Sequence, residues 1–280
     1  MPRKCQVECG IHYSTFRLGM PLKRMVLNLH KSLVANLIPN CHFHATDKYA
    51  SNMVKRLRLM PAHRISEIPV LPLPAEFSSI PTKQECRSIL KLPQDKRLIG
   101  IVGAISSHPK KGVPEVLATL KQMRNNEYAV VLAGKLSSEL RLACYRDYER
   151  YIRSGSLFIA DEFLSDRDML LYLKAIDICS TVYREFYTSS AMVVLATCLG
   201  TPFLSPKSAW FADFAKDYQS GALLSNKELT NVDVESIPIT DYSGQKSGGR
   251  RKSLINYCSA ENFSSLWSNR LAGYCASLDS

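Results

Sequence analysis

The sequence predicts an α/β fold built on a Rossmann-like parallel sheet with helices on both faces. Runs of mostly apolar residues occur at residues 98–102, 129–133, 157–160, 178–182 and 201–204. Such runs, which lack polar alternation, are typical of strands buried on both faces. Segments with helical spacing of apolar residues separate them, and this alternation indicates parallel βαβ units. Ligands of such sheets bind beyond the carboxyl ends of the strands.

Glycines close the first two predicted strands. Gly103 follows the run at 98–102, and a loop at 104–111 leads to a helix that starts near Val113. Gly134 follows the run at 129–133, and residues 137–152 predict one long polar helix. The order strand, glycine turn, helix is therefore expected twice in succession.

Hydroxyl side chains mark the starts of other helices. Thr82 with Glu85, and Ser165 with Asp168, have the spacing of a capping box. An apolar helix is expected over residues 190–199, ended by Gly200, because glycine readily adopts the left-handed conformation at a helix end.

The two ends of the chain differ from this regular middle. Residues 25–38 predict an amphipathic helix, 41–45 a strand, 46–59 a second helix and 65–73 a proline-rich linker. Residues 241–251 are rich in Ser and Gly and predict a mobile segment. The last helix carries one apolar stripe, which needs a partner. The stripe consists of Phe263, Leu266, Trp267, Leu271 and Tyr274.

Three parts are therefore expected. Residues 1–75 form an amino-terminal segment and a linker, 76–248 form the main α/β domain, and 249–280 form the carboxy-terminal helix.

Composition is ordinary for a soluble globular protein, with 46% hydrophobic and 22% charged residues among 280. No apolar stretch approaches the roughly 20 residues of a transmembrane helix, and the first residues lack a signal-peptide pattern. We therefore expect a cytoplasmic protein whose nine scattered cysteines are mostly reduced. Cys41, His42 and His44 alternate along a strand, which places Cys41 on the other face and argues against a metal site.

A net charge of +11 fits nucleic acid, an anionic membrane surface or an anionic small ligand. Basic residues are dispersed except at 55–58 and 250–252, and no nucleic-acid recognition pattern accompanies them. We expect most of them to form a solvated surface, with no nucleic-acid partner and with peripheral membrane association left open.

Several segments, in the right order, resemble retaining glycosyltransferases of the GT-B type. The resemblance is to the family 4-like branch that builds bacterial exopolysaccharide or colanic acid, mainly to its carboxy-terminal, donor-binding domain. It spans about residues 40–225. It also implies that residues 1–75 are an incomplete form of the family's acceptor-side domain, and that the last helix, in residues 249–280, packs back on this segment and contacts residues 25–59. The similar segments are 68–77, 90–96, 103–112, 163–166, 172–177, 196–202 and 221–224.

The resemblance implies a sugar transfer from a nucleoside diphosphate-sugar to a saccharide acceptor in polysaccharide biosynthesis, with retention, a hexosyl group and no metal cofactor. It places Lys111 at the diphosphate, with Lys110 as a second cation, and Glu185 as a further catalytic residue. The free N–H groups at the start of the helix after the loop Tyr187-Thr-Ser-Ser would bind phosphate. The implied donor-binding residues are Gly103, Ala104, Lys110, Lys111, Leu164, Tyr187, Thr188, Ser189 and Ser190.

Two departures support an alternative. The family's two sugar- and ribose-binding glutamates fall on Tyr187 and Leu195. The family's usual arginine falls on Ala104, but the branch that this chain resembles tolerates a small residue there. The amino-terminal half is also short compared with the family's acceptor domain. A non-catalytic GT-B-like binding or assembly protein therefore remains the second hypothesis.

Overall fold

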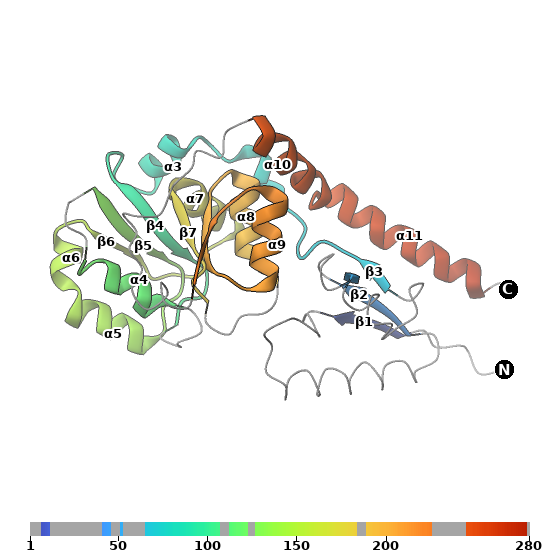
Figure 1. Cartoon of the computed structure of the whole chain (residues 1–280), viewed down its shortest axis with the longest axis horizontal. Helices are drawn as coiled ribbons and strands as arrows, with labels where there is room; N and C mark the ends of the chain where they lie inside the picture. Colours follow the sequence, from blue (N-terminus) through green and yellow to red (C-terminus); the bar gives the residue numbers. More distant parts are fainter. Residues whose placement is uncertain are drawn as a thin grey trace.

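The structure, a computed structural model, describes residues 7–11, 41–45, 51–52, 65–106, 112–122, 127–183, 189–225 and 245–278. It contains a three-stranded sheet in the order β1-β2-β3 and a six-stranded sheet in the order β6-β5-β4-β7-β8-β9. Figure 1 shows helices around the six-stranded sheet and α11 running from it toward the three-stranded sheet.

All pairings in the six-stranded sheet are parallel, which confirms the α/β prediction. The sheet has one strand more than the five apolar runs, because the short segment after Gly221 pairs with β8. Its strands are β4 (Arg97–Val102), β5 (Tyr128–Ala133), β6 (Leu157–Ala160), β7 (Ile178–Ser180), β8 (Phe203–Pro206) and β9 (Ala222–Leu224).

Successive residues of one strand face two different cores, as strand geometry requires. Leu98 and Val131 lie in one apolar cluster, whereas Ile99 and Val130 lie in the other. The first cluster is covered by α3 (Lys83–Ile89), α7 (Asp166–Ala175), α8 (Ala191–Leu199), α9 (Ala209–Tyr218) and α10 (Gln245–Tyr257). The second is covered mainly by α4 (Val113–Thr119) and α5 (Ser138–Asp147). Both faces of the sheet are therefore buried, as its apolar strands predict.

The expected helix caps are present. The Glu85 N–H donates to Thr82 Oγ1 at 3.4 Å, and the Thr82 N–H donates to Glu85 Oε2 at 2.9 Å, which completes the capping box of α3. Ser165 accepts from the Asp168 N–H at 3.1 Å at the start of α7. Gly200 ends α8 with a left-handed φ of 79°.

The single helix expected over 137–152 is instead two helices. The break is at Tyr148 (φ −126°), between α5 and α6 (Glu149–Arg153). The new direction brings Tyr151 and Ile152 against the second apolar cluster, so tertiary packing determines the break.

The amino-terminal sheet is parallel and small. Its strands are β1 (Val7–Ile11), β2 (Cys41–Ala45) and β3 (Ile65–Glu67). The strand expected at 41–45 is confirmed, β1 was not predicted, and the expected linker begins with β3. The helices expected at 25–38 and 46–59 fall outside the described residues, apart from helical residues 51–52.

The mobile segment expected at 241–251 is wrong for residues 245–251, which belong to α10. Leu254 is buried against the first cluster, and Arg250 donates to the carbonyls of Lys216 at 3.0 Å and Asp217 at 2.9 Å. A Cβ at Gly200 would collide with Arg251, so that side chain lies at the end of α8. Two of the three residues in the basic run 250–252 thus lie at the carboxyl ends of helices, where positive charge is favourable.

The last helix, α11 (Ala260–Leu278), follows α10 after a short turn. At that turn the Leu73 N–H donates to the Cys258 carbonyl at 2.7 Å, which joins the segment after β3 to the end of α10. Further along, the Trp267 ring lies 4.8 Å from the His44 ring on β2. The expected apolar stripe therefore contacts residue 44, within the region 25–59.

Within the described ranges, none of the helices combines the length and apolar character that a membrane span requires. The same ranges contain no group of three His, Cys, Asp or Glu side chains arranged like metal ligands. Five described cysteines are free thiols, namely Cys86, Cys144, Cys179, Cys198 and Cys258.

Candidate functional site

The strand order creates a topological switch point between β4 and β7. From β4 the chain proceeds outward through β5 and β6, and from β7 it proceeds in the other direction through β8 and β9. The loops that follow β4 and β7 therefore leave the sheet in opposite directions. Open α/β sheets bind ligands at this position, beyond the carboxyl ends of the strands.

Glycine backbones shape the turn after β4. Gly103 has φ of 106° and Gly134 has φ of 135°, which other residues rarely adopt. A Cβ on Gly134 would overlap the Gly103 carbonyl oxygen, so the turns after β4 and β5 are in direct backbone contact. A Cβ on Gly103 would lie 3.9 Å from the sulfur of Met192. The first turn of α8 is thus next to the end of β4.

A third glycine fixes the point where the loop after β4 returns to the fold. Gly112 is the N-cap of α4, with φ of 64°, and a Cβ there would overlap the carbonyl oxygen of Val182. Val182 is the second residue after β7, so the residue next to Lys111 in the chain packs on the segment after β7. The loop that contains Lys110 and Lys111 therefore begins and ends at the switch point.

The amino end of α8 completes this edge. Ser190 is the N-cap, is buried, and accepts from the Val193 N–H at 3.4 Å. The N–H groups of Ala191 and Met192, at the first two helical positions, have no acceptor within the helix because of helix geometry. Together with the helix dipole they favour an anion.

The buried side chain of Tyr183 contacts this helix start through a hydrogen bond with Ser190. Burial raises the pKa of its phenol, and a hydrogen bond with Ser190 acts in the opposite direction. The phenol therefore stays neutral and lies against the cap rather than acting as an acid or base. Gly112, Gly134 and Tyr183 belong to this edge but were not among the site residues predicted from the sequence. The positions of the two glycines just before α4 and just after β5 were the available signal.

The described site residues from the sequence fall into two groups. Gly103, Ala104, Ser189 and Ser190 lie on the segments that follow β4 and β7, and Ala104 is exposed. Leu164 lies in the loop after β6, two strands from β4, and packs half-buried against the first apolar cluster. The remaining candidates, Lys110, Lys111, Glu185, Tyr187 and Thr188, lie outside the described residues.

No protein-family model and no curated protein sequence matches the chain. Solved structures do match. Sucrose-phosphate synthase from Thermosynechococcus elongatus is 14% identical, with 97% of this chain and 68% of that chain covered and a TM-score of 0.71. A glycosyltransferase from Rickettsia africae is 11% identical, with 95% and 69% covered and a TM-score of 0.62.

Anabaena HepE, solved with UDP and glucose, is 14% identical, with 97% of this chain and 72% of that chain covered and a TM-score of 0.61. The fold is that of GT-B glycosyltransferases. Identities this low show the fold alone. The chain spans about two thirds of the length of these structures, 68–72%.

Proposed function

We propose that this protein is a glycosyltransferase that binds a nucleoside diphosphate-sugar at the β4–β7 edge. The observation that carries the proposal is the contact between the glycine turn after β4 and the first turn of α8, at the switch point of a GT-B fold. UDP and UDP-glucose bound to HepE, which shares this fold, support a nucleotide-sugar as the ligand class.

The departing diphosphate gains negative charge as the glycosidic bond breaks, so preorganised donors and cations lower the barrier. In the proposal, the N–H groups of Ala191 and Met192 donate to phosphate oxygens, and Lys111 supplies a positive charge with Lys110 beside it. Gly103 lacks a side chain, which lets phosphate oxygens approach the backbone. These groups would stabilise the leaving group without a metal ion.

The finer parts of the proposal follow from the resemblance in sequence. They are a hexosyl donor, retention of configuration with Glu185 near the sugar, and a saccharide acceptor in polysaccharide biosynthesis. A cytoplasmic location, with the basic surface near an anionic membrane, belongs to the same proposal.

Calorimetric titration of UDP, GDP and ADP tests the donor site. We expect at least one nucleotide to bind. Lys111→Ala should weaken its binding by about 2 kcal/mol, because a hydrogen bond to a charged group contributes about 1.5–3 kcal/mol. Lys252→Ala removes the same charge from an exposed position on α10 and serves as the control. Equal affinities in the two variants would contradict the role of Lys111, and flat isotherms in the parent would contradict the donor site.

A non-catalytic relative is the second candidate, and one observation favours it. Leu195, at the position of one family glutamate, is fully buried in the first apolar cluster. Its side chain therefore supports packing and offers no acceptor to a ribose. Nucleotide binding without release of nucleoside diphosphate from any sugar donor, in the presence of mixed saccharide acceptors, would favour this candidate over the enzyme.

A further inference from the structure

Two buried thiols meet where α8 packs against α10, close to the turn that leads into α11 (Figure 1). Cys198 lies in the last turn of α8, and Cys258 lies in the turn between α10 and α11. They are 3% and 1% exposed and belong to the first apolar cluster. Their thiols are hydrogen-bonded to each other, although residues 199–257 lie between them in the sequence. The fold therefore brings two cysteines from distant segments into direct contact.

Three other buried cysteines have different surroundings. Cys86 Sγ donates to the Pro81 carbonyl at 3.6 Å. Cys144 lies in the second apolar cluster, and Cys179 lies on β7. In the part of the chain that the structure describes, no hydrogen bond joins any two of these three thiols. They are therefore matched buried thiols with which the contacting pair can be compared.

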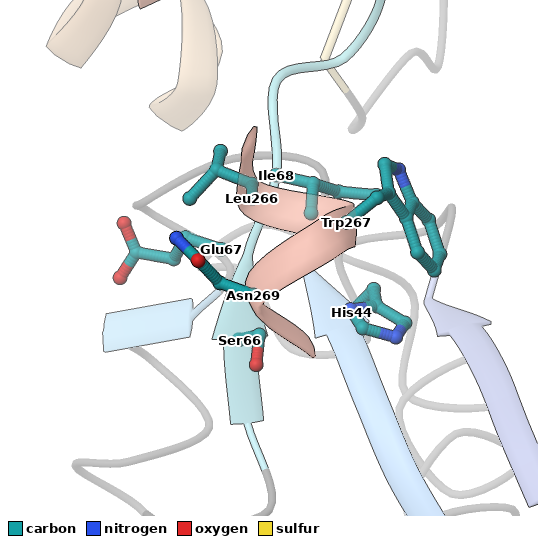
Figure 2. A pocket seen from close by; sticks show the side chains of 7 residues that line it. All are labelled: His44, Ser66, Glu67, Ile68, Leu266, Trp267 and Asn269. Carbon is teal, nitrogen blue, oxygen red and sulfur yellow. The ribbon is translucent and has the colours of Figure 1, made fainter. Parts of the chain in front are cut away.

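The pair lies at the joint between the two sheets. The Leu73 N–H donates to the Cys258 carbonyl at 2.7 Å, so the segment after β3 and the turn after α10 meet at this residue. Beyond the turn, α11 brings Trp267 to the His44 ring on β2, and Figure 2 shows both rings among the residues that line a pocket there. A covalent bond at Cys258 would fix the point where both connections between the sheets begin.

The surroundings keep the pair reduced while the turn is closed. The hydrogen bond with Cys258 and burial raise the pKa of the Cys198 thiol, whereas the charge of Arg251 lowers it. Because the thiolate is the nucleophile in disulfide exchange, the closed pair reacts slowly. Local opening of the turn removes the hydrogen bond and leaves Arg251 beside the thiol. Opening of the turn therefore favours the reactive thiolate of Cys198.

We propose that Cys198 and Cys258 form a reversible disulfide that locks the turn between α10 and α11 to α8. The oxidant is a small disulfide such as glutathione disulfide. The Cys198 thiolate attacks one of its sulfurs, which gives a mixed disulfide and releases one glutathione thiolate. The Cys258 thiolate then attacks the Cys198 sulfur and releases the second glutathione thiolate.

The exchange is balanced, because two protein thiols are oxidised while one glutathione disulfide is reduced to two thiols, which take up the two protons. A bond that is made and broken by such exchange is typical of redox-sensing cysteines. Its formation does not depend on the donor site.

Peptide mass spectrometry of the full chain, incubated with glutathione disulfide and then alkylated, provides the test. We expect a peptide pair linked through Cys198 and Cys258, in a yield at least about tenfold above that of any other pair, because thiols in contact have a high effective concentration. Dithiothreitol should restore both thiols. Cys258→Ala should stop the reaction at the mixed disulfide on Cys198. Cys144→Ala, a buried change in the second cluster, should leave the yield unchanged.

The oxidised parent should be held more tightly at the joint. The Leu73 amide, which donates to the Cys258 carbonyl, should exchange its hydrogen at least about tenfold more slowly than in the reduced parent. The urea midpoint should also rise on oxidation, because the bond constrains the unfolded chain across residues 199–257. Both measurements compare two redox states of the parent, so they do not require a variant to fold.

Absence of the bond between Cys198 and Cys258 after prolonged incubation with glutathione disulfide would overturn the proposal. Formation of the bond only in urea would do the same, since an unfolded chain joins any of its thiols. A yield no higher than that of pairs with Cys86 or Cys179 would mean that the contact has no effect on oxidation. Unchanged exchange of the Leu73 amide in the oxidised protein would show that the bond does not lock the joint.

Discussion

At the amino ends of β4 and β7 the strands are joined by side-chain hydrogen bonds and ion pairs, whereas at their carboxyl ends the contacts are made by backbone. Asp177, just before β7, accepts from Lys83 Nζ at 2.8 Å, from an Arg87 guanidinium N–H at 2.6 Å and from the Leu98 N–H at 2.7 Å. Arg87 also donates to the Ala175 carbonyl at 2.8 Å. These bonds tie α3, β4 and α7 together.

The carboxyl end has a different construction. Gly103, Gly112 and Gly134 pass close to other backbone atoms, and α8 begins with its free N–H groups at the same edge. Such an edge leaves backbone donors available to a ligand, while the amino end uses its donors internally. The difference fits the proposed donor site, because the amino end of the sheet carries the stabilising network and the carboxyl end keeps backbone donors for a ligand.

The largest effect is expected for Asp177→Asn. The amide cannot balance the charge of Arg87, whose side chain is only 6% exposed, so the free energy of unfolding falls by about 3 kcal/mol. Nucleotide affinity is unchanged, because the change lies at the amino end. Urea denaturation and calorimetry measure the two quantities.

Asp147→Asn is the matched control for this change, since Asp147 forms an exposed ion pair with Arg146. Its effect on stability should be small, because exposed pairs contribute little. Equal losses of stability in the two variants would mean that the carboxylate of Asp177 contributes no more to stability than the exposed carboxylate of Asp147.

The loss of stability at acid pH should depend on the same hydrogen bonds and ion pairs of Asp177. Burial raises the pKa of Asp177, but the hydrogen bond and charge of Lys83, the Leu98 N–H and the charge of Arg87 lower it more, so the pKa in the folded protein is below the ordinary value. The resulting stabilisation is complete above the unfolded-state pKa of about 4 and is lost as pH falls through the lower folded-state pKa. The parent should therefore lose stability more steeply than Asp177→Asn between about pH 5 and pH 3. Parallel curves from urea denaturation would contradict this.

Much of the main domain could be predicted from sequence because its signals are local. The apolar strand runs, the caps at Thr82, Ser165 and Ser190, and the glycine at the end of α8 all lie within a few residues of the structures they specify. The Asp177 network could not be found this way, since its partners are 79–94 residues distant in sequence. Long-range packing also explains α10. Its glycines predicted mobility, but Arg250 donates to carbonyls at the end of α9 and Arg251 lies beside Gly200 at the end of α8.

The candidate site was predictable only as two loops. Their convergence depends on strand order, which places β4 beside β7 although residues 103–177 lie between them in the sequence. The short strand β1 was missed because Glu8 and Gly10 interrupt its apolar pattern. Neither the convergence of the two loops nor the strand β1 can be predicted from local periodicity.

A smaller effect, confined to binding, is expected for Ala191→Pro. Ala191 is the first residue of α8, where proline removes one N–H and leaves the helix intact. Ser190, at φ −117° and ψ 116°, already has the extended conformation that precedes proline. We expect nucleotide affinity to fall by about 1 kcal/mol with little change in stability.

The equivalent change at the start of α9, Ala209→Pro, is the control for that variant. Ser208 there is also extended, and α9 follows β8 rather than a strand of the switch point. A loss of affinity in Ala209→Pro that equals the loss in Ala191→Pro would mean that the start of α8 has no special role.

Amide hydrogen exchange with and without the tightest-binding nucleotide tests the division between the two ends most directly. We expect slower exchange after nucleotide addition in residues 103–106 and 189–193. Exchange in residues 83–98 and 175–178, around Asp177, should be unchanged. Protection confined to the amino end, or no protection at saturating nucleotide, would contradict a diphosphate site at the carboxyl ends of β4 and β7.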